Sequence, residues 1–258
     1  MDDSHRLLVD LRLPPSRYAE PERRVAFADA VVERLGALPG VDAAAVSSLV
    51  PVSRLWNEIN AVDVEGRPTP AGDQAATAFH YRVTAGYFDV MGIPLLAGRG
   101  FSNADRPGSP PVAIVSEAFA RRHFAGASPI GARIRDDEAA PWMEIVGVAG
   151  EVQHAGLGQS SLPQYYTPFA QTPAGGLSVV IHAAVPPRSL ADAARAAIGR
   201  VDPDLPLIGV QPMAAMVASS IALPRLRTML MAAFGLIALA LAAVGLFGVV
   251  ACAVTERS

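Results

Sequence analysis

Apolar and polar residues alternate along residues 7–13, where leucine or valine occupies every second position. This period of two predicts a β-strand with one buried face. Residues 20–38 change to helical spacing, and Pro39-Gly40 ends the predicted helix. The apolar stripe of this helix consists of Val25, Ala28, Val32 and Leu35. The apolar run Val41–Val46 then predicts a second strand, so the chain opens with a β-α-β unit.

A second β-α-β unit is predicted far downstream. Alternation along Leu177–His182 predicts its first strand. Ser189 followed by Asp192 resembles a capping box, which predicts a helix that runs to about Val201. Pro206–Gln211 predicts the return strand.

The segment between these units, residues 80–170, is rich in glycine and predicts short elements of both kinds. They are a helix around Tyr87, a strand at Val112–Val115, a helix at Glu117–Phe124, and strands at Arg133–Arg135 and Met143–Val148. One further strand, Ile59–Val64, is predicted upstream of this segment. We interpret Gly92, Gly98 and Gly131 as positions of tight turns or close packing, with ordinary loop glycine as the alternative.

This order of elements predicts an α+β protein with a split domain. The two β-α-β units, in residues 1–79 and 171–221, form one domain, and residues 80–170 form a mixed α/β domain inserted into it.

The last apolar stretch, Met229–Val254, contains no charged residue. As a helix it would be about 39 Å long, which exceeds the bilayer core of about 30 Å. We therefore expect a transmembrane helix, preceded by a connector at residues 222–228 and followed by the start of a cytoplasmic segment at 255–258. Small residues recur on one face and predict close helix packing, although an alanine-rich helix also produces such a stripe by chance. These residues are Gly235, Ala238, Ala242 and Gly245.

Charge flanking this helix leaves its orientation open. Arg225 and Arg227 precede it and only Arg257 follows, which favours a tail-anchored cytoplasmic protein if the positive-inside rule holds. A first membrane helix elsewhere in a longer protein would override that rule.

Composition excludes several functions. All 21 basic residues are arginine, and without lysine the chain has neither a nucleotide-hydrolysing P-loop nor a Schiff-base catalyst. A net charge of −3 with mixed signs indicates no nucleic-acid partner. The single cysteine, Cys252, permits no intrachain disulfide.

Candidate catalytic residues are also missing from the sequence. The five histidines are scattered, and Glu151 with His154 lies in a predicted strand-to-loop stretch rather than on the helix that a di-iron site needs. We interpret Asp136, Asp137 and Glu138 as a solvated hairpin tip. We therefore expect no catalytic residue, no cofactor and no metal.

Several blocks of the sequence carry a family resemblance. They are Ala85–Phe101 (AGYFDVMGIPLLAGRGF), Val112–Phe124 (VAIVSEAFARRHF), Pro129–Gly131, Glu144–Val148 and Pro163–Pro168 (PQYYTP), preceded by Leu38–Val41 and Val50-Pro51. In this order they resemble the extracytoplasmic domain of MacB/FtsX-type bacterial ABC transporter permeases.

The resemblance implies a porter part made of β-α-β units and an inserted Sabre part, and residues 229–254 would be the second of four membrane helices. It also implies a location at the bacterial cytoplasmic (inner) membrane with the bulk of the chain outside the cytoplasm. Implied partners are an ABC ATPase subunit, a second permease copy, and a periplasmic adaptor or other extracytoplasmic protein. The chain would then be a non-catalytic piece of a longer permease that passes ATP-driven motion outward. A tail-anchored cytoplasmic protein and a membrane-tethered enzyme are the alternatives.

Overall fold

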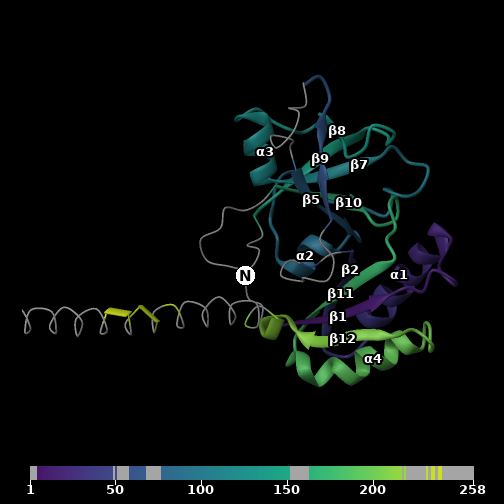
Figure 1. Ribbon diagram of the computed structural model, residues 1–258. Coiled ribbons are helices and arrows are strands. Elements are labelled where there is room, and N and C mark those ends of the chain that lie inside the picture. Colours follow the sequence, from purple (N-terminus) through teal and green to yellow (C-terminus); the bar gives the residue numbers. More distant parts are fainter. Residues whose placement is uncertain are drawn as a thin grey trace, which may run out of the picture. The chain divides into compact units, whose positions relative to one another are not determined.

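The two predicted β-α-β units interleave in one sheet (Figure 1). In the computed structural model they are β1 (Arg6–Arg12), α1 (Pro21–Gly36) and β2 (Val41–Ser47), and β11 (Gly176–Ala183), α4 (Ala191–Gly199) and β12 (Leu207–Pro212). The strand order is β12-β1-β11-β2, with every neighbouring pair antiparallel. The two strands of each unit therefore run parallel, separated by one strand of the other unit, which is the ferredoxin-like arrangement.

The structure describes residues 5–48, 50, 58–67, 77–151, 163–216, 218, 231, 234–235 and 238–239. Within this part of the chain, residues up to Met216 form one compact unit, and the few described positions beyond it belong to a second unit, Val217–Ser258.

Strand β1 is buried on both faces, so the prediction of one buried face is wrong. Leu7, Val9 and Leu11 pack with the helices α1 and α4 in one core. Leu8 points to the opposite face, where it joins a second core with α2 (Tyr87–Met91). Asp10 is also buried there, and it accepts a hydrogen bond of 2.5 Å from the Ser178 hydroxyl. Cover on both faces explains why nearly every residue of this strand avoids water.

Helix α1 is confirmed, but its buried face is wider than the predicted stripe. Ala28 and Leu35 are buried as expected, whereas Val25 and Val32 are only half-buried and Phe27 and Val31 take their place in the core. The reason is that α1 packs against both β2 and α4, so contact extends around the helix.

The predicted capping box at the start of the last helix is wrong. Residues Pro187–Leu190 form a 3-10 turn, η3, in which the Ser189 hydroxyl donates to the Pro186 carbonyl at 2.7 Å. Helix α4 begins afterwards, at Ala191, without a side-chain cap.

The sheet continues beyond β2 through the rest of the chain. The further strands are β3 (Ile59–Ala61), β4 (Asp63–Val64), β5 (Thr77–Val83), β6 (Leu95–Gly98), β7 (Val112–Ser116), β8 (Arg133–Arg135), β9 (Met143–Ala149) and β10 (Gln164–Pro168). The order runs β2-β5-β10-β7-β9-β8-β4, while β3 pairs with β5 and β6 pairs with β9. A division of this continuous sheet into porter-like and inserted domains stays a prediction.

Most elements predicted between the two units are confirmed within a residue or two. Helix α3 spans Glu117–Phe124 as expected, and the Ser116 hydroxyl caps it by accepting from the Phe119 amide. The predicted strand at residues 59–64 is two strands, β3 and β4, because its halves pair with different partners, β5 and β8.

The predicted connector at residues 222–228, the membrane helix at 229–254 and the tail at 255–258 lie almost wholly outside the described residues. Gly235 and Ala238 are described and helical, whereas Ala242 and Gly245 are not described. Among the described residues, no helix combines the length and the apolar character that crossing a membrane requires.

Candidate functional site

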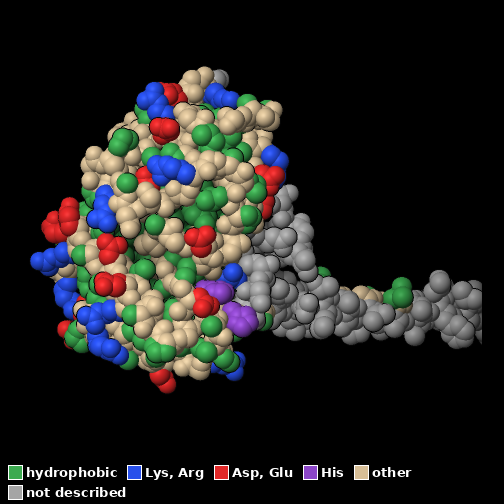
Figure 2. Space-filling model, turned by 180° about the vertical axis from the view of Figure 1, so that it is seen from behind, with side chains coloured by type: hydrophobic (Ala, Val, Ile, Leu, Met, Phe, Trp, Pro, Cys, Tyr) green, Lys and Arg blue, Asp and Glu red, His purple; other side chains and the backbone are tan. Residues whose placement is uncertain are grey.

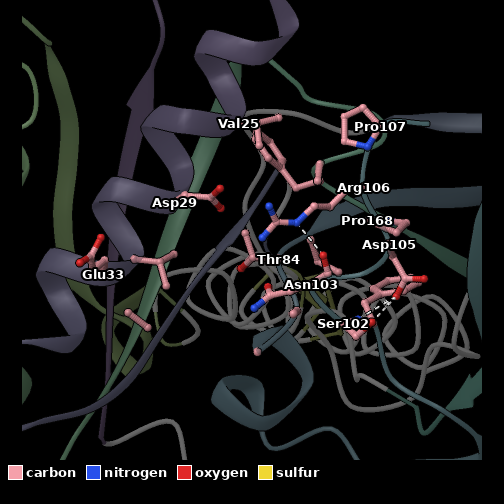
Figure 3. A pocket seen from close by; sticks show the side chains of 18 residues that line it. Val25, Asp29, Glu33, Thr84, Ser102, Asn103, Asp105, Arg106, Pro107 and Pro168 are labelled. Carbon is pink, nitrogen blue, oxygen red and sulfur yellow. Dashed lines mark hydrogen bonds between the residues drawn. The ribbon is translucent and has the colours of Figure 1, made fainter. Parts of the chain in front are cut away.

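A cavity lies beside α1, where the first β-α-β unit meets the rest of the sheet (Figure 3). Its volume is about 590 Å³. Its walls are α1, the turn after β5, the loop at residues 101–107 and the residues that follow β10. The apolar part of the lining consists of Val25, Val32, Ala44, Val83, Ala85, Phe101, Pro107, Pro168, Phe169 and Ala170.

Charged side chains reach this cavity from two opposite walls. Asp29 and Glu33 lie one helical turn apart on α1, and Arg106 belongs to the loop at residues 101–107. Figure 3 shows Arg106 extending toward the helix that carries Asp29. Within the described part of the chain, neither carboxylate has a hydrogen bond or an ion pair within 4.0 Å.

An ion pair between the buried Asp105 and the half-exposed Arg99 restrains the loop that carries Arg106. Asp105 is 6% exposed and takes both terminal nitrogens of Arg99 at 2.9 Å, while the Ser102 amide donates to it at 2.7 Å. The Arg99 guanidinium therefore holds the pKa of Asp105 below its usual range. A bidentate pair of this kind fixes direction as well as distance, so the loop has one preferred conformation.

A second polar cluster surrounds His80 on β5. Its Nε2 lies 2.8 Å from the Thr167 hydroxyl of β10, and its ring stacks on Tyr165 with centroids 4.3 Å apart. Its Nδ1 faces Glu58 at 3.4 Å and Asp136 at 3.6 Å. Four separate segments therefore meet at one imidazole that is 2% exposed.

Burial and neighbouring charge perturb the groups of this cluster. Burial lowers the pKa of His80, and the neighbouring carboxylates only partly offset that effect. The close approach of the His80 ring, together with the ion pair to Arg82, lowers the pKa of Glu58. Burial and the hydrogen bond to Asp136 raise the pKa of Tyr165.

The interpretation of Asp136 as part of a solvated hairpin tip is wrong in one respect. The hairpin between β8 and β9 exists, and Asp137 and Glu138 are exposed on it. Asp136, however, turns inward and accepts a hydrogen bond of 2.7 Å from the Tyr165 hydroxyl. The inward turn depends on contacts with distant strands that the local sequence does not reveal. Among the described residues, no group of three or more His, Cys, Asp or Glu side chains could hold a metal.

The family model of the MacB-like periplasmic core domain matches residues 5–201. The chain belongs to this family. The match confirms the resemblance and makes the chain an extracytoplasmic domain of the MacB/FtsX-like ABC transporter permeases. No curated protein matches the chain.

Solved structures share the fold. The periplasmic region of MacB from Actinobacillus actinomycetemcomitans is 15% identical with a TM-score of 0.53, and the match covers 85% of this chain and 94% of that one. A domain of a putative permease protein from Porphyromonas gingivalis is 16% identical with a TM-score of 0.50, covering 81% and 91%. The extracellular domain of the noncanonic ABC-type transporter YknZ from Gram-positive bacteria is 15% identical with a TM-score of 0.50, covering 79% and 100%.

The family blocks meet at the cavity of this MacB-like domain. The block at residues 85–101 supplies Ala85, Gly86 and Phe101 to the lining, and the block at residues 163–168 supplies Pro168. Sequence reasoning missed the charged lining, because residues 29, 33 and 106 are far apart and match no motif. The only available signal was the spacing of four between Asp29 and Glu33 on one helix.

Acidic and basic side chains are interspersed on the face seen in Figure 2. The predicted helix-packing residues are not tested by these observations and stay a prediction.

Proposed function

We propose that this domain is the non-catalytic extracytoplasmic module of an ABC transporter permease and that it transmits membrane-helix motion to substrate export or to a partner protein. The ATP would be hydrolysed by a separate ABC ATPase. A second permease copy and a periplasmic adaptor or other extracytoplasmic protein are the further proposed partners. The proposed location is the bacterial cytoplasmic (inner) membrane, with residues 229–254 as the membrane helix.

The observation that carries the proposal is the position of β12 in the sheet. It pairs with β1 along most of its length, and β1 is a buried strand that lies between β12 and β11 in the sheet. Residues 213–216 continue directly from β12 as a helical turn, with Met213 and Met216 buried in the core that contains Leu8. Force applied at this end would therefore act on a hydrogen-bonded strand and on two core side chains. A hydrogen-bonded strand cannot absorb a displacement as a flexible linker does.

The proposed domain division assigns residues 1–79 and 171–221 to a porter-like part and residues 80–170 to a Sabre-like part. The alternatives of a tail-anchored cytoplasmic protein and a membrane-tethered enzyme gain no support from the family match.

The test is a flexible Gly/Ser linker inserted at Pro224 of the intact permease. Transmission predicts that ATPase activity and folding persist while transport or partner activation is lost, because the linker absorbs the displacement. The matched control inserts the same linker after Gly66, which lies in the exposed turn that follows β4. Unimpaired transport with the linker at Pro224 would exclude the lever mechanism, and a tethered enzyme would behave in that way.

A further inference from the structure

The cavity beside α1 has the dimensions and lining of a small-molecule site. Its volume of about 590 Å³ lies within the range of about 300–1,000 Å³ that is typical of such pockets. Two aromatic rings, Phe101 and Phe169, and the prolines 107 and 168 supply apolar surface. Pockets of this kind take an apolar body and orient it with a few polar groups.

Four charged residues line this cavity, and one of them is neutralised within the protein. Asp105 is fully engaged by Arg99 and the Ser102 amide, as described above. Asp29, Glu33 and Arg106 are exposed to solvent, and within the described residues neither the two carboxylates nor the two terminal nitrogens of Arg106 have a hydrogen-bond or ion-pair partner. The unneutralised charges are therefore carboxylates on the helical wall and a guanidinium on the loop wall.

The Arg106 guanidinium is held in place by its Nε, and its two terminal nitrogens stay available for a ligand. Its Nε donates to the Asn103 carbonyl at 2.6 Å, and its own carbonyl accepts from the Ser109 amide at 3.1 Å and from the Ser109 hydroxyl at 2.8 Å. These bonds fix the backbone of Arg106 and the Nε atom of its guanidinium. The remaining N–H groups keep the planar fork that pairs with a carboxylate.

We propose that this cavity binds a small zwitterion of the amino-acid or short-peptide type. Its ammonium group lies at Asp29, with Glu33 one turn further along α1, and its carboxylate lies at Arg106. Its apolar side chains rest on Phe101, Phe169 and the prolines. This site does not depend on the transmission proposed above.

Other ligand classes fit these walls less well. A phosphate or another simple anion would satisfy Arg106 but would face the two carboxylates of α1. An organic cation would satisfy Asp29 but would face Arg106. A neutral apolar molecule would displace water from three charged groups without offering them new hydrogen bonds, which is unfavourable. Only a ligand with both charges pairs with both walls.

The experiment is calorimetry on the full chain in detergent micelles with the dipeptide Leu-Leu as the probe. Two capped forms, N-acetyl-Leu-Leu and Leu-Leu-amide, each remove one end charge and keep the apolar body. We expect saturable binding of the free dipeptide and a loss of about tenfold or more with either cap. A tenfold loss of affinity corresponds to about 1.4 kcal/mol.

Two variants assign the ends of the dipeptide. Asp29→Asn should remove the preference for the free N-terminus and keep the preference for the free C-terminus, and Arg106→Gln should do the reverse. The matched controls are Glu22→Gln and Arg34→Gln, two exposed α1 positions outside the cavity, and neither should change affinity. Thermal unfolding of each variant verifies the fold.

Three results would overturn the proposal. They are no saturable binding of Leu-Leu to the folded wild-type chain, equal binding of the free and capped dipeptides, and folded Asp29→Asn and Arg106→Gln variants that discriminate as the wild type does.

Discussion

Replacement of Gly98 by alanine tests how closely strand β6 approaches β9. Gly98 has a φ of +74°, and a Cβ built on it would lie 2.1 Å from the Val146 carbonyl oxygen and 2.9 Å from the Gly147 Cα. Both neighbours are backbone atoms. The Val146 oxygen also accepts a hydrogen bond of 2.9 Å from the Arg99 amide, so it cannot move away without loss of that bond.

The expected cost has two parts. A left-handed conformation costs a non-glycine residue about 1–2 kcal/mol, and crowding of a packed region adds about 1–3 kcal/mol. The free energy of unfolding should therefore fall by about 2–5 kcal/mol. For a unit of this size about 1 kcal/mol corresponds to about 2–4 °C in Tm, so thermal unfolding followed by circular dichroism should show a drop of about 4–20 °C.

Gly131→Ala separates the two parts of that cost. Gly131 also has a positive φ of +83°, but nothing lies within 4 Å of its built Cβ. This variant should therefore lose only the conformational part, about 1–2 kcal/mol. If the free energy of unfolding of Gly98→Ala is no lower than that of Gly131→Ala, the close approach of the two strands adds no cost to a side chain at Gly98. That result would refute the reasoning.

Two further predictions concern orientation and pH. In a full-length permease with Cys252→Ala, a cysteine introduced as Ala139→Cys in the exposed β8–β9 turn should react with a membrane-impermeant maleimide in intact spheroplasts; labelling only after lysis would favour the tail-anchored alternative. Burial lowers the pKa of His80 below its usual 6.5, so the unfolded chain binds more protons and unfolding free energy falls as pH drops below about 6.5. Glu58, whose pKa is also lowered, adds a loss in the same direction below its usual 4.5. Denaturant unfolding from pH 7.5 to 5.5 should show this decline, and His80→Gln should flatten it; equal stability at both pH values in the wild type contradicts the assignment.

Local patterns were sufficient for elements whose packing partners leave a regular trace in the sequence. Helix α3 begins and ends where predicted, because Ser116 supplies a cap and Ala118, Phe119 and Phe124 supply a buried side. The interleaving of the two β-α-β units left no such trace. Strand β11 lies between β1 and β2 although about 130 residues separate it from β2, and only the tertiary fold brings these strands together.

Strands β5, β6 and β10 were not predicted from the sequence, and the burial of β6 and β10 explains why those two were missed. Strand β10 is buried at every position, yet it contains Gln164 and Thr167 and lacks alternation. Gln164 Oε1 accepts from the Tyr166 hydroxyl two residues further on, and Thr167 pairs with the distant His80 on β5. Strand β6 is exposed at all four positions, so no buried face marks it. Alternation is the clearest signal of a strand when one face is buried and the other is exposed to water, and neither β6 nor β10 has that arrangement.

The cavity was not predicted because its walls come from segments that are distant in the sequence. Its position follows from how strands β2 and β5 are joined. Strands β2 and β5 pair at Ser47 and Val83, and backbone hydrogen bonds from Ser48 to Arg82 and from Thr84 to Val46 flank that pair. Val83 and the next residue, Thr84, line the cavity, and the Thr84 hydroxyl accepts from the Val46 amide at 2.9 Å. This short junction is one place where a change in the angle between the two parts of the sheet would be taken up. Such a change would move α1 relative to the loop that carries Arg106. If a ligand binds in the cavity and the proposed motion through β12 changes this junction, the coupling is reciprocal: each would alter the other by the same free energy.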